Sequence, residues 1–107
     1  MLTQHQKIFT IMVNNLEKWF LPQDFMDKSL GHLFVGYEAS ARLSEMGSQH
    51  HDVIESTREG KYIKRRITRH GLEAYYDTLP ADMKVIAKTV IIVPKDGRLF
   101  PLAPITN

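Results

Sequence analysis

The chain has 107 residues, of which 43% are hydrophobic and 24% charged, and it has no cysteine. This length suits one domain whose core folds without crosslinks, and the composition excludes a disordered or fibrous chain. The lack of cysteine excludes disulfides, thiolate zinc sites and a cysteine nucleophile. Because no signal-peptide pattern and no apolar stretch near the roughly 20 residues of a membrane span are visible, we expect a cytoplasmic protein without a membrane partner.

The positive charge is concentrated in one segment. The formal net charge is only +2, with an isoelectric point near 9.0, so the total indicates little about partners. However, six of the fourteen lysines and arginines lie within positions 58–69. A basic cluster of this kind is a candidate contact for a polyanion.

Two helices are expected in the first third of the chain. Thr3 and Gln6 have the spacing of a capping box, and apolar residues then recur at helical intervals, which predicts a helix over residues 3–19. Pro22 suits the first turn of a helix, so a short second helix is expected over residues 23–30, with Gly31 as its stop. Residues 32–35 read as an apolar connector.

A third helix is predicted over residues 37–46. Ala39, Leu43 and Met46 form a narrow apolar stripe at i, i+4 and i+7, and Gly47 supplies a stop. The helix has two further faces: a small, mostly uncharged one made of Tyr37, Ser40, Ala41 and Ser44, and a charged one made of Glu38, Arg42 and Glu45.

A β-hairpin is predicted over residues 53–69, where two β-prone segments flank a glycine-containing turn. The period of two places Ile63, Arg65 and Ile67 on one side, and Tyr62, Lys64 and Arg66 on the side that faces solvent or a ligand. Arg65 between two isoleucines does not fit an inward face, except at a strand edge where its aliphatic stem covers apolar surface.

The last third predicts fewer regular elements. Leu72, Tyr75, Tyr76 and Leu79 fit one or two helical turns before Pro80. Residues 88–93 are predicted as a buried strand, residues 94–103 as a second hairpin whose return strand Pro101 confines to an edge, and the end as a frayed tail. We therefore expect a domain over residues 1–79 and an extension over residues 80–107 that packs on it or mediates dimerisation.

The predicted elements follow the order helix, short helix, helix, basic hairpin, and the passages GYEASARLSEM and VIESTREGKYIKRRI supply the last two of them. Over about residues 7–69 this order resembles the winged helix-turn-helix superfamily of DNA-binding proteins. The resemblance implies an α+β fold of three helices plus a β-hairpin wing, here with a C-terminal β-hairpin extension, and makes residues 37–46 the recognition helix. It also implies a homodimer, because such proteins usually read two half-sites.

Double-stranded DNA is the partner that the residues themselves favour. Short side chains let a helix backbone approach base edges in the major groove, and a basic hairpin beside it contacts phosphates in a salt-sensitive way. The predicted DNA-binding residues are Tyr37, Ser40, Arg42, Ser44, Arg58, Lys61, Tyr62, Lys64, Arg66 and Arg69. The expected function is DNA binding in transcriptional regulation or as a phage or mobile-element accessory protein.

Two other interpretations remain open. The small helix face suits close packing against another element, and the basic cluster suits a solvated rim partly neutralised by Glu55 and Glu59. Glu38 and Glu45 count against DNA, because phosphate repels them. Together with the apolar segment 88–103, they favour a protein-protein interaction module that acts as an inhibitor or adaptor.

Catalysis and cofactor binding are not expected. The sequence has no GxSxG, GxGxxG or P-loop pattern, and its five histidines lack the spacing of a metal site. We therefore predict no enzyme activity, no catalytic residue, no cofactor and no bound metal.

Overall fold

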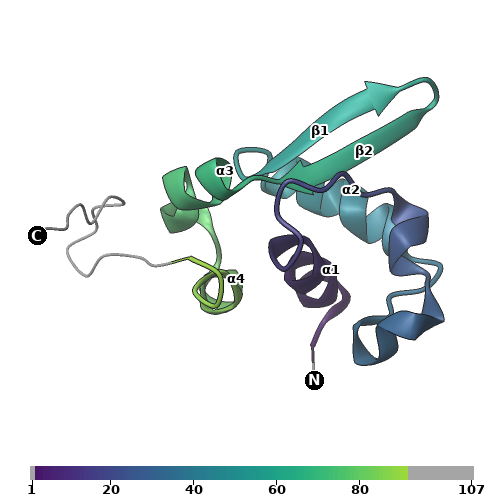
Figure 1. The fold of residues 1–107 in the computed structure, drawn as a ribbon, viewed down its shortest axis with the longest axis horizontal. Helices are drawn as coiled ribbons and strands as arrows, with labels where there is room; N and C mark the ends of the chain where they lie inside the picture. Colours follow the sequence, from purple (N-terminus) through teal and green to yellow (C-terminus); the bar gives the residue numbers. More distant parts are fainter. Residues whose placement is uncertain (1, 92–107) are drawn as a thin grey trace, which may run out of the picture.

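The computed structural model describes residues 2–91, and in this range one antiparallel hairpin projects from a group of four α-helices (Figure 1). The α-helices and strands are, in chain order, α1 (Gln4–Val13), α2 (Ala39–Gln49), β1 (Ile54–Glu59), β2 (Tyr62–Ile67), α3 (Arg69–Ala74) and α4 (Ala81–Ala87). Three short 3-10 helices are η1 (Pro22–Phe25), η2 (Lys28–Leu33) and η3 (Tyr76–Thr78). The predicted α+β class is confirmed.

Helix α1 begins at the predicted capping box and ends six residues before the predicted end. The Thr3 hydroxyl accepts a hydrogen bond from the Gln6 N–H at 3.1 Å, and the Gln6 side chain accepts one from the Thr3 N–H at 2.8 Å. After Val13, the Asn15 side-chain Nδ2 donates a hydrogen bond to the Ile11 carbonyl at 2.9 Å, and Glu17 adopts a left-handed φ of 74°. The prediction that the helix extends to residue 19 is wrong, because the chain turns here to run beside the hairpin.

Phe20 attaches this turning segment to β2. Its N–H donates to the Arg65 carbonyl at 2.7 Å, and the Arg65 N–H donates back to the Phe20 carbonyl at 3.0 Å, which makes an antiparallel bridge. The Phe20 ring is 3% exposed and stacks on Phe25, with 5.2 Å between the ring centroids. The connection after α1 is therefore fixed both to the hairpin and to the core.

The region predicted as a single second helix forms two 3-10 helices instead. Pro22 begins η1, where the Asp24 carboxylate accepts a hydrogen bond from the Leu21 N–H at 2.7 Å. Gly31 lies inside η2 with a φ of 62°, so it kinks this element rather than ending it. The prediction of one helix over residues 23–30 is wrong, because this region forms two separate short 3-10 helices, the second of which is kinked.

Helix α2 carries the predicted apolar stripe, and Ala39, Leu43 and Met46 are fully buried. It starts two residues after the predicted start and continues through Gly47 to Gln49, so the prediction that Gly47 stops the helix is wrong. Because Gly47 has no side chain, the Arg65 side chain of β2 can pack closely against α2 at this position.

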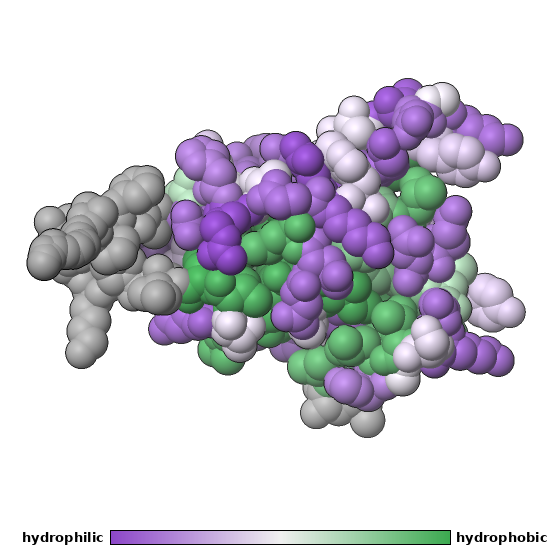
Figure 2. All heavy atoms as spheres, in the orientation of Figure 1, coloured by the Kyte–Doolittle hydropathy of each residue, from purple (hydrophilic) through white to green (hydrophobic). Residues whose placement is uncertain are grey.

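The hairpin has the predicted position. Ile54 pairs with Ile67 at its base and Glu59 pairs with Tyr62 at its tip, where Gly60 takes a φ of 63° in the turn. Ile54 and Ile67 are buried, whereas the strands become exposed toward the tip. Figure 2 shows hydrophilic side chains along the projecting hairpin.

The C-terminal part of the described chain is helical. Leu72, Tyr76 and Leu79 are buried in and after α3, as predicted, whereas Tyr75 of the same predicted set is exposed. The sequence did not predict α4, which follows Pro80. Residues 88–91 continue from α4 as turns and a bend, so the predicted strand is wrong over this range; residues 92–93 and the second hairpin predicted over 94–103 lie outside the described residues.

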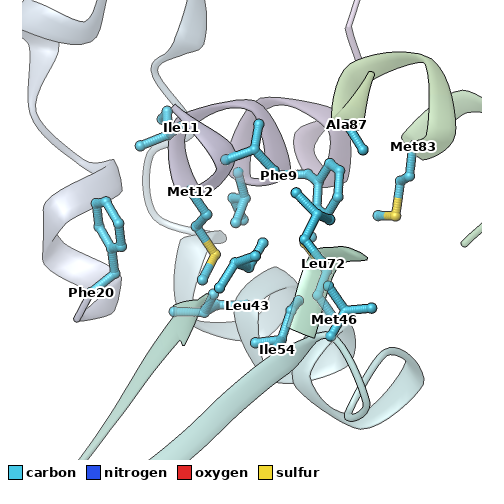
Figure 3. Packing of buried hydrophobic residues seen from close by; sticks show 14 of the residues in the cluster. Phe9, Ile11, Met12, Phe20, Leu43, Met46, Ile54, Leu72, Met83 and Ala87 are labelled. Atoms are coloured by element: carbon cyan, nitrogen blue, oxygen red, sulfur yellow. The ribbon is translucent and has the colours of Figure 1, made fainter. Parts of the chain in front are cut away.

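One hydrophobic core joins these elements (Figure 3). Phe9 and Met12 of α1 lie between α2, the hairpin base and the C-terminal helices, where Met83 of α4 is 3% exposed. The hairpin base and α2 are thus held by the same core, which places the base of the hairpin beside α2. No helix within residues 2–91 has the length and apolar character that a membrane crossing needs.

Candidate nucleic-acid interface

A groove of about 260 Å³ separates the exposed side of α2 from the tip half of β2. Ser40 and Ser44 line it from α2, and residues 61–63 together with Arg65 line it from the hairpin. Leu21 and Pro22 complete the lining. We call this feature the groove. It brings together four of the predicted site residues: Ser40, Ser44, Lys61 and Tyr62.

The groove side of α2 consists of small residues. Ser40, Ser44 and Gly47 recur at i, i+4 and i+7, which places them in one row along the helix. Both serines are exposed to solvent. The close packing considered as an alternative for Tyr37, Ser40, Ala41 and Ser44 is not present in the described chain, where all four are exposed.

Gly47 makes room for the side chain of Arg65. A Cβ atom at position 47 would lie 2.5 Å from the Arg65 Nε and 3.2 Å from its Cδ, so any larger residue displaces the arginine. The Arg65 Nε is buried and has no hydrogen-bond partner in the described chain. Burial also lowers the pKa of the Arg65 guanidinium, although such a group stays charged at neutral pH. Arg65 thus points inward, beside α2, in the phase of Ile63 and Ile67.

The two faces of the hairpin carry different charges. Residues that pair across the two strands lie on the same face of the hairpin. Arg58 pairs with Ile63, and Ile63 shares its face with Arg65. Arg58 therefore lies on the hairpin face that is turned toward α2. Within residues 2–91, neither Arg58 nor Lys61 forms an ion pair. The groove side of the hairpin therefore carries positive charge that no described carboxylate neutralises.

Lys64 and Arg66 lie on the opposite face of the hairpin, which we call its outer face. Lys64 forms an ion pair with Glu59, and the Arg66 Nε donates to the Glu55 carboxylate at 2.8 Å. Both cations also lie over the ring of Trp19, at 5.5 Å and 4.5 Å from its centroid. The solvated rim considered as an alternative describes this outer face, because its two cations are paired within the chain.

Arg42 is also paired within the chain. Its position two residues after Ser40 places it on the far side of α2, where its Nη1 donates to both oxygens of Glu45, at 2.8 and 2.9 Å. Its Nε donates to the Gln4 side chain at 2.9 Å, and Glu38 lies 3.7 Å from its Nη2. The geometry does not bring Arg42 into the groove.

The glutamates of α2 share this far side. Glu45 binds the His5 imidazole at 2.9 Å as well as Arg42, and the hydrogen bond from His5, followed by that from Arg42, lowers the pKa of the Glu45 carboxyl. Glu38 and Glu45 are therefore turned away from the groove and face cationic or donor groups.

Tyr37 and Arg69 lie outside the groove. Tyr37 precedes α2 and is 97% exposed, beside a separate hollow that it lines with Met26 and Phe34. Arg69 starts α3 at the opposite end of the hairpin from the tip. Its N–H donates to the Glu17 carboxylate at 2.8 Å, and its guanidinium contacts the Val90 carbonyl at 3.3 Å and Glu73 at 3.8 Å.

The sequence prediction missed Gly47 and Arg65 as parts of the site. Each carried a signal: Gly47 continues the Ser40 and Ser44 row, and Arg65 occupies the inward phase of a strand. No group of three or more histidines and carboxylates that could hold a metal is present in the described part of the chain.

Comparison with protein-family models, curated proteins and solved structures gives no match for this chain. The function is therefore argued from the groove and the residues around it.

Proposed function

We propose that the chain is a winged helix-turn-helix protein that binds double-stranded DNA, with α2 as its recognition helix and the β1–β2 hairpin as its wing. The observation that carries the proposal is the groove, where exposed serines of α2 face cations of the hairpin that form no ion pair with a described residue. The order helix, short helices, helix, hairpin on which the resemblance rests is also the order of the elements up to residue 67.

The exposed row on α2 suits the major groove. Ser40, Ala41 and Ser44 are short and exposed, so the helix backbone can approach the base edges, and the serine hydroxyls can donate to or accept from them. Larger side chains on this face would keep the helix away from the duplex. Base contacts of this kind supply sequence discrimination, whereas phosphate contacts position the protein.

The tip of the hairpin supplies the phosphate contacts. Arg58 and Lys61 are exposed. Arg58 lies on the strand face that is turned toward α2, and Lys61 lies in the turn and lines the groove with Ser40 and Ser44. A duplex that meets α2 therefore also meets these two cations. Lys64, Arg66, Arg42 and Arg69 are left out of the proposed interface, because their charges are already paired within the chain.

The charges on α2 favour DNA over a protein partner. The protein-interaction alternative rested on Glu38 and Glu45 and on the apolar segment 88–103. The two glutamates lie on the far side of α2 next to Arg42, and residues 92–103 of the segment lie outside the described residues. DNA in the groove would not meet these carboxylates. A role in transcriptional regulation or as a phage or mobile-element accessory protein, and a homodimer, remain part of this proposal through the resemblance alone.

A salt titration with two matched double variants tests the proposal. Anisotropy of labelled duplex DNA of random sequence is measured for the wild type, for Arg58→Ala with Lys61→Ala, and for Lys64→Ala with Arg66→Ala. Both variants lose two positive charges. Because each phosphate contact contributes about 0.9 to the slope of log K against log salt, the first variant should lose about 1.8 from the slope, and the second should stay within about 0.5 of the wild type.

The difference is large enough to measure. A slope change of about 1.8 alters the loss of affinity over a fourfold rise in salt by about twelvefold. Equal effects of the two variants would contradict the proposed interface, since they would reflect net charge alone. Absence of salt-sensitive DNA binding by the wild type would remove the DNA proposal and leave the protein-interaction alternative.

A further inference from the structure

We propose that the groove between α2 and β2 is a binding site for one phosphate group, which Arg65 and Lys61 contact together with the hydroxyls of Ser40 and Ser44. The inference rests on the proposed function and deepens it, because in a DNA complex this group is a backbone phosphate that fixes how far α2 enters the duplex. A free phosphate compound has the same chemistry and is distinguished by the experiment below.

The charge of Arg65 is the first observation. Its Nε is buried without a hydrogen-bond partner, and no carboxylate of residues 2–91 forms an ion pair with its guanidinium. A charged group that is partly removed from water without an opposite charge is unfavourable in the unliganded protein. A bound anion supplies the missing charge.

The distribution of glutamates on the hairpin is the second observation. On the outer face, Lys64 is paired with Glu59 and Arg66 with Glu55. The groove face presents Arg65 and Lys61 with no glutamate or aspartate among the lining residues. The chain thus neutralises the cations of one face and leaves those of the other for an external anion.

The lining fits a phosphate in chemistry and in size. A guanidinium matches two phosphate oxygens with parallel hydrogen bonds, a lysine adds a compact charge, and serine hydroxyls donate to the remaining oxygens. The volume of about 260 Å³ is below the roughly 300–1,000 Å³ of pockets that enclose drug-sized ligands, so the groove suits a small anion or a single backbone unit.

Gly47 acts as a positioning residue for this site. Because a Cβ there would lie 2.5 Å from the Arg65 Nε, alanine at this position must displace the guanidinium while leaving the charge of the protein unchanged. Alanine also has the higher helix propensity, so α2 should be retained in this variant. Gly47→Ala therefore perturbs the proposed site without removing a charge or weakening the helix.

The first test follows the Arg65 side-chain Nε–Hε signal and the Ser40 and Ser44 amide signals by NMR during titration with inorganic phosphate, with chloride at equal ionic strength as the reference. Saturable shifts specific to phosphate are expected in the wild type and in Arg66→Gln, the matched charge control on the outer face. Loss of a hydrogen bond to a charged group should weaken phosphate binding by about tenfold or more in Arg65→Gln, and Gly47→Ala should weaken it as well. The amide spectra report whether each variant is folded.

The outcomes separate this proposal from the proposed function. Equal shifts with phosphate and chloride, or undiminished phosphate shifts in Arg65→Gln, would overturn the phosphate site. If duplex DNA binds, and Arg65→Gln and Gly47→Ala weaken DNA binding more than Arg66→Gln does, the phosphate that the groove binds is a backbone phosphate of DNA. If both groove variants bind DNA like the wild type, the phosphate site fails while DNA binding stands. Specific phosphate binding without DNA binding supports the site with a free phosphate compound and rejects the DNA function.

Discussion

Phe20 is the residue whose removal should most clearly loosen the hairpin from the body of the protein. Phe20 is only 3% exposed, and its ring stacks on Phe25. Truncation of a buried phenylalanine to alanine typically costs about 3–5 kcal/mol, which is a large part of the roughly 5–15 kcal/mol by which domains are stable. We expect Phe20→Ala to lose about 3–5 kcal/mol of unfolding free energy, and Phe20→Leu about 1–1.5 kcal/mol, since leucine keeps most of the apolar volume but not the ring stacking.

Urea unfolding monitored by circular dichroism measures both losses, and Trp19, the single tryptophan, gives a second probe by fluorescence. Tyr37→Ala serves as the control, because a side chain that is 97% exposed should change stability by no more than about 0.5 kcal/mol. Hydrogen exchange of the Phe20 and Arg65 amides, which form the bridge to β2, should be slow in the wild type and faster in Phe20→Ala. A loss below about 1 kcal/mol in Phe20→Ala would refute the idea that this residue fixes the connection after α1 to the core.

Two other predictions concern pH and assembly. Burial, reinforced by the nearby charge of His5 and opposed by Asp82, lowers the pKa of His50 below 6.5, so the unfolded chain takes up this proton more readily than the folded one. This group should therefore leave the unfolding free energy unchanged above pH 6.5 and lower it as the pH decreases from 6.5 toward the folded-state pKa. His50→Gln should flatten this decline, whereas His32→Gln, at an exposed position, should not. Equal pH profiles of stability for the two variants would contradict the assignment to His50. The homodimer implied by the resemblance should sediment at twice the 12.4 kDa chain mass, and a single species of 12.4 kDa at micromolar concentration would reject it.

The parts of the fold that the sequence predicted correctly are those fixed by neighbouring residues. The capping box of Thr3 and Gln6 and the stripe of Ala39, Leu43 and Met46 depend on the helical period alone, and both are present. The hairpin also depends on local alternation and on a glycine turn. By contrast, the early end of α1 depends on a distant partner, because the segment after Val13 leaves the helix to pair with β2. An apolar periodicity that continues to Trp19 cannot reveal this competition.

Contacts with residues distant in the sequence also explain why only some of the predicted site residues lie in the groove. A period of two correctly separated Lys64 and Arg66 from Arg65, but it could not show which face meets α2 or which cations have a glutamate across the strand pair. Lys64 and Arg66 alternate outward along the strand, which predicts from the sequence that they are available to a ligand. Their availability is in fact reduced by Glu59 and Glu55, so the unpaired charge lies on the groove side of the hairpin.

Gly47 and Arg65 show most directly why such a site requires the tertiary structure. Viewed singly, a glycine eight residues into α2 costs helix stability, and an arginine between two isoleucines interrupts an apolar strand face. Viewed together, each explains the other, since the glycine leaves the space that the Arg65 side chain occupies. Two locally unfavourable choices that compensate each other in space are expected where function, rather than folding alone, constrains the sequence. This pairing, more than the number of basic residues in the hairpin, is the reason to place the candidate site in the groove.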